Sequence, residues 1–469
     1  MNFTAFPSAR IIASEWLSVA GRRLDCNPYM SGAIEARALL KQSPLRRELL
    51  SDLTAGHAGG IYNGPMFKRN YVTSRKYGVP FISSGSMLLA DLSRLPLLRK
   101  RDAESSRLSY LQLSTGTTLI SCSGSIGRMS FVRPGMKDMW SSQDVLKVVP
   151  DEGKVSPGYL YAFLSGKYGV PLVVAGTYGA IIQHIEPEHV SSIEIPRVAR
   201  QRETEVDQKI RRAAELRDFA ETTLRGVAEE FDALFPSLRA KESREATTSM
   251  IMASESQTRM DAEYHNPLAA DIRRTLASVP SISIGDWCDR IFLPGIFKRI
   301  HVPGPESAAL YFTGFSLYWN EPEPKGYLSK ITKLFKDVQL EQGMILVQAF
   351  GQEGGLTGRP VWVGKHLAGT TTTHMLVRLI VEDTARAAFL FGFLNSQLAY
   401  NQISCLTYGG SIPHFDEAGI RKVLVPRLGI AREKSIAQRV LEAVGARDEA
   451  LDLELAARRD VEMMIAGGT

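Results

Sequence analysis

Motifs that could carry out catalysis are scarce in this chain. It contains no GxxxxGK[ST] phosphate-binding loop, so we do not expect an NTP-driven motor. The nearest match to a nuclease signature is Pro150-Asp151-Glu152-Gly153-Lys154. A metal-dependent nuclease brings its carboxylates together from separate strands, whereas these two are adjacent in sequence, so we interpret the segment as a hairpin turn. A Gly-x-Ser-x-Gly nucleophile elbow is also missing. We therefore expect no catalytic and no cofactor-binding residue on this chain.

Histidines and cysteines are the residues of this sequence most suited to bind a transition metal. His184 and His189 flank Glu186 and Glu188, and His and Glu side chains can bind zinc. Only His184 has a counterpart elsewhere in the chain, His414, so we favour histidines that bond to nearby backbone over zinc ligands. The cysteines show no CxxC spacing, which argues against both a metal site and a disulfide framework; they are Cys26, Cys122, Cys288 and Cys405.

Composition places the chain among ordinary globular proteins. It has 469 residues, of which 44% are hydrophobic and 23% charged, which excludes a largely disordered chain. No apolar run approaches the ~20 residues needed to span a bilayer, and the first residues do not resemble a secretion signal. We therefore expect a cytoplasmic protein with no membrane contact. The excess of 56 basic over 50 acidic residues is compatible with binding a polyanion.

The sequence contains a long internal repeat with a spacing of about 230 residues. Thr177-Tyr178-Gly179 recurs as Thr407-Tyr408-Gly409, and Phe67-Lys68-Arg69 recurs as Phe297-Lys298-Arg299. Because the spacing agrees at points far apart in the chain, we infer that most of the sequence is duplicated.

Each copy has two parts of different character. Residues 1–199 and 258–429 mix β-branched and aromatic runs with Gly, Pro and Ser turns, which predicts strands with a few short helices. Residues 200–235 and 430–466 contain no proline, which favours a long helix in each copy. A polar stretch over 239–257 is the expected linker. The runs that we predict as strands are 117–122, 145–149, 344–348 and 375–380.

Both predicted helices, assigned to 200–238 and 430–469, carry an apolar seam with steps of three and four residues. Two similar seams favour packing of the helices against each other. Glu454 interrupts the second seam, and we expect Leu451 and Leu455 to fill it there. Arg217 and Arg447 interrupt both seams; either they turn toward carboxylates or a partner, or Leu216 and Ala446 take the seam and the arginines are solvated. The principal seam residues are Val206, Ile210, Leu224, Phe231, Ile436, Val440, Leu451 and Val461.

Together these patterns resemble the specificity subunits of Type I restriction-modification systems, over nearly the whole chain. In each copy Thr-Tyr-Gly is followed by a hydrophobic residue, a histidine and an Ile/Val-rich stretch with proline. Further matches are Arg23-Leu24-Asp25, Arg259-Met260-Asp261 and the glycine patterns of 116–127 and 343–354. One departure is Arg200-Gln201-Arg202-Glu203, which stands where the family often has Glu-Gln before the helix.

The resemblance implies an α+β fold: two tandem target-recognition domains, each followed by a long helix, with the helices forming an antiparallel coiled-coil spacer. It implies a non-catalytic subunit that recognises a split, asymmetric duplex DNA target. The implied partners are two methyltransferase subunits, with or without restriction subunits. S-adenosylmethionine and, where restriction subunits are present, ATP and Mg would bind to those partners, and the modified base would be adenine at N6. Two alternatives stay open: a specificity-like adaptor of another defence system, and a scaffold that binds no nucleic acid.

Candidate DNA contacts follow from what the two copies share and where they differ. Phosphate contacts position a protein without specifying sequence, so we assign them to the shared residues Lys68, Arg69, Lys298 and Arg299; a solvated strand end is the alternative. We assign base readout to the divergent segments 86–110 and 316–336, because Arg and Lys can pair with guanine acceptors. The candidates there are Arg94, Arg99, Lys100, Arg101, Arg107, Trp319, Tyr327, Lys330 and Lys333.

Overall fold

The computed structural model describes residues 11–19, 22–179, 183–238, 248, 250, 259–352 and 354–467. Apart from Thr248 and Met250, the linker predicted over 239–257 lies outside these residues. The chain divides into two compact units. The first unit combines residues 1–218 with 449–469, and the second comprises residues 219–448. The boundaries fall inside two long helices, α8 (Arg200–Ala233) and α16 (Ile430–Ile465), so each unit holds one part of both.

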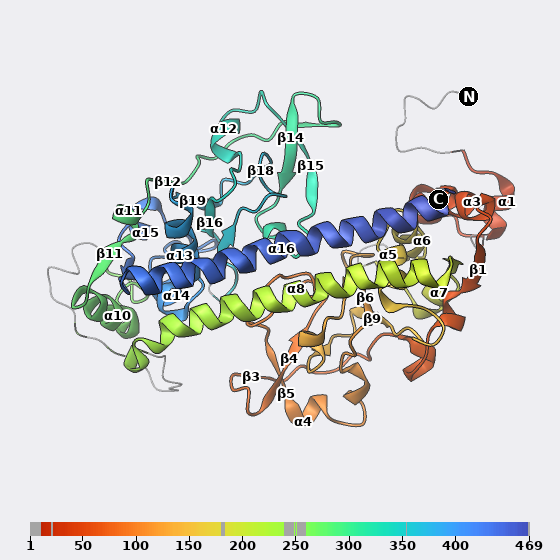
Figure 1. Cartoon of the computed structure of the whole chain (residues 1–469), viewed down its shortest axis with the longest axis horizontal. Coiled ribbons are helices and arrows are strands. Elements are labelled where there is room, and N and C mark those ends of the chain that lie inside the picture. Colours follow the sequence, from red (N-terminus) through yellow and green to blue (C-terminus); the bar gives the residue numbers. More distant parts are fainter. Residues whose placement is uncertain are drawn as a thin grey trace. The chain divides into compact units, whose positions relative to one another are not determined.

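The first unit contains three small sheets (Figure 1). One is the antiparallel pair β1-β10; the others have the orders β2-β9-β6-β7 and β3-β5-β4-β8. All their pairings are antiparallel except β4 with β8. The strands are β1 (Arg46–Leu49), β2 (Ile61–Tyr62), β3 (Tyr71–Val72), β4 (Gly78–Ile82), β5 (Leu97–Arg99), β6 (Thr118–Ser121), β7 (Met129–Phe131), β8 (Trp140–Ser141), β9 (Val145–Val148) and β10 (Glu194–Arg197).

The second unit repeats this arrangement strand for strand. Its sheets are β11-β20, β12-β19-β16-β17 and β13-β15-β14-β18, and again one pairing, β14 with β18, is parallel. The duplication seen in the sequence is therefore a duplication of topology. The strands are β11 (Ser281–Ser283), β12 (Arg290–Phe292), β13 (His301–Val302), β14 (Ala308–Phe312), β15 (Pro324–Ser329), β16 (Ile345–Gln348), β17 (Pro360–Trp362), β18 (Thr371–Thr372), β19 (Leu376–Ile380) and β20 (Leu424–Pro426).

Most, but not all, of the short helices accompany the sheets in matching places. Those of the first unit are α1 (Ser14–Val19), α2 (Asn27–Met30), α3 (Ala33–Gln42), α4 (Lys100–Ala103), α5 (Pro157–Leu164), α6 (Gly169–Val174) and α7 (Pro187–Ser191). Those of the second are α10 (Pro267–Ala277), α11 (Ile284–Trp287), α12 (Phe335–Val338), α13 (Thr384–Leu394), α14 (Gln397–Ser404) and α15 (Glu417–Ile420). The predicted mixture of helix and sheet is confirmed, and β6, β9, β16 and β19 coincide with the four predicted strands.

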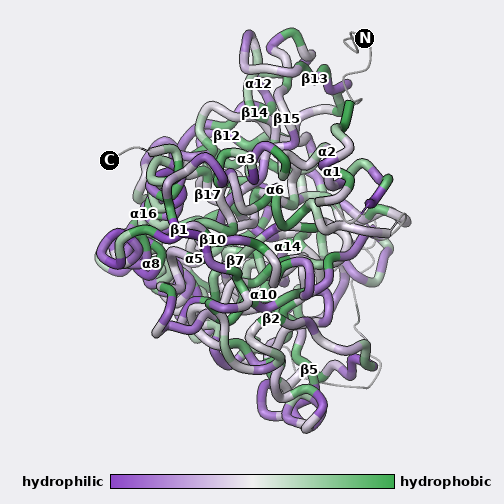
Figure 2. The backbone as a smooth tube through the Cα atoms, turned by 90° about the vertical axis from the view of Figure 1, so that its right-hand side faces the viewer, coloured by the Kyte–Doolittle hydropathy of each residue, from purple (hydrophilic) through white to green (hydrophobic). Residues whose placement is uncertain are grey.

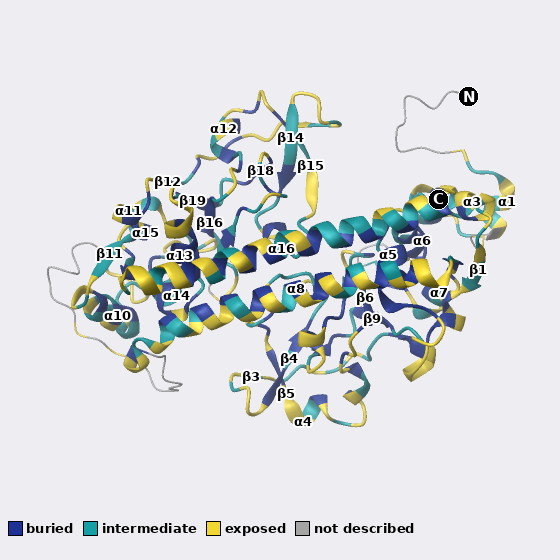
Figure 3. Cartoon of the chain, in the orientation of Figure 1, coloured by how far each residue is buried: buried dark blue, intermediate teal, exposed yellow. Residues whose placement is uncertain are grey.

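The seam residues of the long helices are buried. In Figure 2, where α8 and α16 are seen nearly end-on, the backbone carries both hydrophilic and hydrophobic residues. Buried and exposed residues alternate along both helices (Figure 3). In the first unit Val206 and Ile210 of α8 join one core with Ala457 and Val461 of α16. In the second unit the Phe231 ring packs edge-on against two rings of α13, those of Phe389 and Phe393, each with its centroid at 5.4 Å. Leu224, Ile436, Val440 and Leu451 are buried as well.

The distal sheet of each unit is the one that contains the parallel pair. In the first unit β3, β4, β5 and α4 lie on the side away from α8 (Figure 1). The other four-stranded sheet carries the larger core, in which every residue of α5 is buried. Smaller separate clusters lie beneath the distal sheets, one around Phe81 and Trp140 and one around Phe297 and Tyr311. Loops on the distal sheets therefore rest on small local cores.

Candidate nucleic-acid interface

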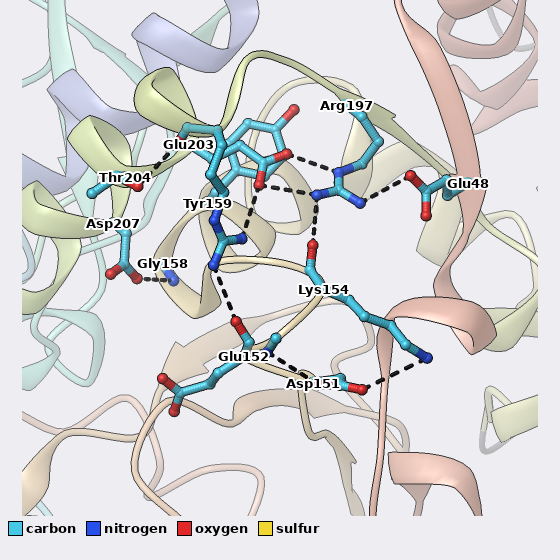
Figure 4. A network of polar contacts seen from close by, with 12 residues as sticks. Glu48, Asp151, Glu152, Lys154, Gly158, Tyr159, Arg197, Glu203, Thr204 and Asp207 are labelled. Atoms are coloured by element: carbon cyan, nitrogen blue, oxygen red, sulfur yellow. Dashed lines mark hydrogen bonds and ion pairs between the residues drawn. The ribbon is translucent and has the colours of Figure 1, made fainter.

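Each long helix is joined to the preceding sheet by an Arg–Glu pair. Arg197, the last residue of β10, donates from Nε and Nη2 to the two carboxylate oxygens of Glu203 at 2.8 and 3.1 Å (Figure 4). Its Nη1 lies 3.1 Å from Glu48 on β1, and Glu203 is fully buried. The matching residues Arg427 and Glu433 make the same two-pronged contact, at 2.8 and 2.9 Å. Glu203, the last residue of the Arg200-Gln201-Arg202-Glu203 segment, therefore forms part of this contact between the sheet and the helix.

The Arg-x-Asp segments hold the Thr-Tyr-Gly turns. Arg259 bonds both oxygens of Asp261, at 2.7 and 2.8 Å, and donates to the carbonyls of Leu406 and Thr407. Arg23 makes the equivalent contacts with Asp25 and the carbonyls of Ala175 and Thr177. These two motifs recur together because they bind each other.

Carboxylates on the long helices accept backbone N–H groups from the β-rich parts. Asp218 accepts from Gly135 at 2.8 Å, and Asp448, about 230 residues later, accepts from Lys365 at 3.1 Å. A second matched set comprises Asp232, which accepts from Gln397 and Leu398, and Glu462, which accepts from Lys167. In each unit, therefore, α8 and α16 both hold the β-rich part, and they do so at equivalent points.

Arg69 and Arg299 occupy equivalent places beneath the distal sheets. Arg69 donates to Gln143 at 3.0 Å and to Asp144 at 3.2 Å, and its guanidinium lies 5.6 Å from the Phe81 ring centroid. Arg299 donates to the Tyr311 hydroxyl at 2.6 Å and to Thr373 at 3.4 Å. Both side chains therefore fasten a loop to the strand turn beside it. Their neighbours Lys68 and Lys298 are exposed.

The base-readout candidates of the first unit gather around β5 and α4. Arg99 is bound through two nitrogens to Asp102, at 3.0 and 2.7 Å, and this hydrogen bonding, with a further bond from Asn70, holds the pKa of Asp102 below its ordinary value. Arg107 donates to the Met66 carbonyl at 2.9 Å. Arg94, Arg99, Lys100, Arg101 and Arg107 are all exposed. Arg94 lies 3.9 Å from Asp91, and Lys100 lies 3.5 Å from Glu104.

The base-readout candidates of the second unit differ in their exposure. Lys330 and Lys333 are exposed, and Tyr327 is half-buried on β15, opposite Leu310. Trp319 is only 7% exposed and packs against Phe315 with centroids 5.7 Å apart. Burial of the indole argues against its assignment to base readout, because little of the ring remains for a base to contact. Phe315, which is 48% exposed, presents the more accessible ring.

A buried cation stands in the central strand of each larger sheet, and sequence reasoning missed both. Lys147 lies opposite Leu119 and Tyr62, and Arg378 lies opposite the matching Leu346 and Phe292. Lys147 donates to the Ser142 carbonyl at 3.3 Å, and Arg378 donates to the Thr373 carbonyl at 2.8 Å. Burial lowers the pKa of Lys147 to about 7 and that of Arg378 to about 9. Both residues lie within otherwise apolar strands at matching positions about 230 residues apart. A charged residue at the same place in both apolar runs is the sequence feature that could have identified them.

These two cations bind the same turns that Arg69 and Arg299 bind. The 142–144 turn takes a bond from Lys147 at Ser142 and bonds from Arg69 at Gln143 and Asp144. In the second unit Thr373 takes the Arg378 bond on its carbonyl and the Arg299 bond on its hydroxyl. In each unit, therefore, two cationic side chains bind one turn, and these bonds hold the turn and the loop that carries Arg69 or Arg299 together.

The histidines weighed as zinc ligands bond to nearby backbone. His189 Nε2 lies 2.8 Å from the Leu172 carbonyl, and the backbone of His184 pairs with that of Tyr178. His414 pairs in the same way with Tyr408, and its ring stacks on Phe350 at 4.9 Å. Within the described part of the chain, no three His, Cys, Asp or Glu side chains are grouped so that they could hold a metal ion. None of the helices in that part is long and apolar enough to cross a membrane.

Comparison with known proteins finds similarity to solved structures only. No protein-family model matches the chain, and no curated protein matches it either. The S subunit of a Type I restriction-modification system from M. genitalium is similar, with a TM-score of 0.35, 13% identity, and coverage of 90% of this chain and 96% of that one. A chain from a structure on complex assembly and conformational transition of the type I R-M system has a TM-score of 0.29, 11% identity and coverage of 91% and 99%. The HsdS subunit from Thermoanaerobacter tengcongensis has a TM-score of 0.25, 11% identity and coverage of 92% and 96%.

Proposed function

We propose that this chain is a non-catalytic specificity subunit that binds a split, asymmetric duplex DNA target and directs methyltransferase partners to it. One observation carries the proposal: two units share the same strand order and the same internal anchors, yet differ in the segments exposed beside those anchors. Two DNA-binding units with the same architecture and different exposed segments would each recognise a different half-sequence. A duplicated DNA-binding module on a two-fold framework reads two half-sites in the same manner.

Charge and loop anchoring support DNA as the ligand. Exposed lysines and arginines surround β5 and α4 in the first unit, and Lys298, Lys330 and Lys333 are exposed in the second. Phosphate contacts of this kind position a protein on DNA, whereas base contacts specify sequence. Arg69 and Arg299 hold the loops that carry Lys68 and Lys298, so the backbone at these two lysines is held in place before DNA binds.

The proposed partners are two identical methyltransferase subunits, with or without restriction subunits, acting in the cytoplasm. The β-rich part of each unit is attached to α8 and α16 at equivalent points, which supports two copies of one partner, because each copy would contact a unit built in the same way. On this proposal S-adenosylmethionine is held by the methyltransferase subunits, ATP and Mg by restriction subunits, and the methylated base is adenine at N6. The two helices would form a coiled-coil spacer between the recognition domains.

The test is selection from a pool of random-sequence duplexes by the full chain, followed by titration of the selected duplex at several salt concentrations. We expect one bipartite sequence with two unlike halves, and affinity that falls steeply with salt because counterions are released. Replacing residues 1–199 by the first domain of another specificity subunit should change one half of the target only. Changes in both halves, or methyl transfer by the isolated chain, would contradict the proposal. Salt-independent binding of proteins without DNA selection would favour a scaffold instead.

A further inference from the structure

An apolar side chain projects into solvent at the same position of both units. Met66, in the loop between β2 and β3, is 83% exposed, and Ile296, about 230 residues later, is 86% exposed. Each immediately precedes the shared Phe-Lys-Arg segment. Exposing a large apolar side chain forgoes the stabilisation that burial would give. Leu24 and Met260 are a second exposed apolar pair at matching positions, so what distinguishes Met66 and Ile296 is the exposed lysine two residues further along each loop.

The backbone that carries Met66 is held on both sides. Arg107 donates to the Met66 carbonyl at 2.9 Å, and the Phe67 ring packs edge-on against Phe81 with centroids 6.0 Å apart. Arg69 fastens the far end of the loop to Asp144 at 3.2 Å. The Met66 side chain is therefore displayed from a fixed backbone.

Ile296 is displayed in the same way by different contacts. Phe297 is 7% exposed and belongs to the small core beneath the distal sheet, together with Tyr311 and Leu328. Arg299 donates to the Tyr311 hydroxyl at 2.6 Å. In both units the residue order is an exposed apolar residue, an aromatic ring packed on the small core, an exposed lysine and an anchoring arginine; the ring of Phe297 is buried and that of Phe67 is partly buried.

We propose that Met66 and Ile296 contact apolar surfaces of DNA bases, one in each half of the target. The inference rests on the proposed function and deepens it. The lysine two residues further along each loop can bind a backbone phosphate, which brings the apolar tip to the groove edge. Two surfaces of duplex DNA offer apolar chemistry there: the 5-methyl group of thymine and the face of a base pair at an opened step. Met and Ile match either surface, and neither can bind a phosphate.

The experiment uses the full chain and the duplex that the wild-type chain selects from a random pool. Met66→Ala and Ile296→Ala should each weaken binding about tenfold, the scale of one buried apolar side chain. Met66→Leu should stay within about twofold of wild type. Leu24→Ala and Met260→Ala are matched controls, because both side chains are 88% exposed but lie outside these loops. Equal melting temperatures establish that the variants are folded.

Two further arms identify the apolar surface. If Met66 contacts a thymine methyl group, replacing that thymine by uracil in the selected duplex should weaken binding of the wild-type chain but not of Met66→Ala. Where a step is opened, a thymine reacts with permanganate in the wild-type complex and not in the variant complex. Alanine variants that bind like the controls overturn the proposal, as does weakened binding with neither signature. If the wild-type chain selects no duplex, the proposed function itself fails, and that result is distinct from all of these.

Discussion

Arg217 and Glu454, the residues that interrupt the apolar seams of α8 and α16, bind each other. The Arg217 guanidinium contacts both oxygens of the Glu454 carboxylate, through Nη1 and, at 2.8 Å, through Nη2. The two side chains are only 10% and 2% exposed. Arg458, one turn along α16, lies 3.6 Å from the same carboxylate. Two apparent flaws in separate helices are one buried ion pair within the first unit.

Glu454→Gln should destabilise the chain by about 3 kcal/mol, because an uncompensated arginine remains buried. The double variant Arg217→Met with Glu454→Leu should recover part of that loss, since well-packed apolar residues commonly replace a buried pair without cost. Full recovery is not expected, because Arg458 loses the same carboxylate. A leucine, Leu224, already stands about 230 residues before Glu454. Denaturant unfolding of Arg217→Met, Glu454→Leu and the double variant measures the coupling.

The matched control is the pair Arg212 and Glu215, 3.3 Å apart on α8 with side chains 57% and 61% exposed. Breaking a solvent-exposed pair should cost no more than about 1 kcal/mol. A loss at Glu454 no larger than the loss at this pair would show that Arg217 and Glu454 do not behave as a buried ion pair.

Lys147 should make stability depend on pH. Burial lowers its pKa in the folded chain to about 7 from an ordinary 10.5. The unfolded chain therefore binds more protons between these values, so stability should rise with pH across that window, by at most about 1.4 kcal/mol per pH unit. Below about pH 7 the full cost of burying the charge applies.

Lys147→Met should remove that slope and stabilise the chain most at low pH. Unfolding measured from pH 7 to 8 lies below the titration of the nearby Cys122 thiol, whose pKa burial raises from 9.0 to about 11 in the folded chain. The other groups facing Lys147 are Asp144 and the Tyr62 ring. Lys154→Met is the control, because the Lys154 side chain is 55% exposed. An unchanged slope in Lys147→Met would place the titration elsewhere.

The sequence predicted the architecture better than the site, for physical reasons. Repeat spacing and apolar periodicity reflect cores and helix seams, and the two units and buried seams agree with them. The seam pattern allowed Arg217 to turn toward a carboxylate, but residue spacing alone could not show that this carboxylate is Glu454. The residue type of Trp319 favours base readout, but its burial depends on packing against Phe315, which the spacing of residues cannot reveal. The carboxylate anchors of α8 and α16 form only after the chain has folded.

Lys68 and Arg69 should respond differently to substitution despite being adjacent. Lys68→Ala should weaken binding of all duplexes alike and reduce the salt slope by about one, without loss of stability. Arg69→Ala should lower stability, because it removes the bonds to Gln143 and Asp144. Binding titrations and thermal melts separate the two effects, and Lys298→Ala and Arg299→Ala repeat the comparison in the second unit. A salt slope unaffected by either lysine would mean that these loops do not meet phosphate.

The long helices should set the spacing between the two half-sequences. α8 has 34 residues, which at ~1.5 Å per residue is roughly 51 Å, or about 15 base pairs at ~3.4 Å each. Deleting residues 219–225 and 449–455 removes one heptad from each helix and keeps the anchors Asp218, Asp232, Asp448 and Glu462. Because Glu454 is lost, the variant also needs Arg217→Leu, which avoids an unpaired buried charge. A heptad spans ~10.5 Å, so the selected spacing should shorten by up to about three base pairs while both half-sequences stay the same. An unchanged spacing would show that the helices are not the ruler.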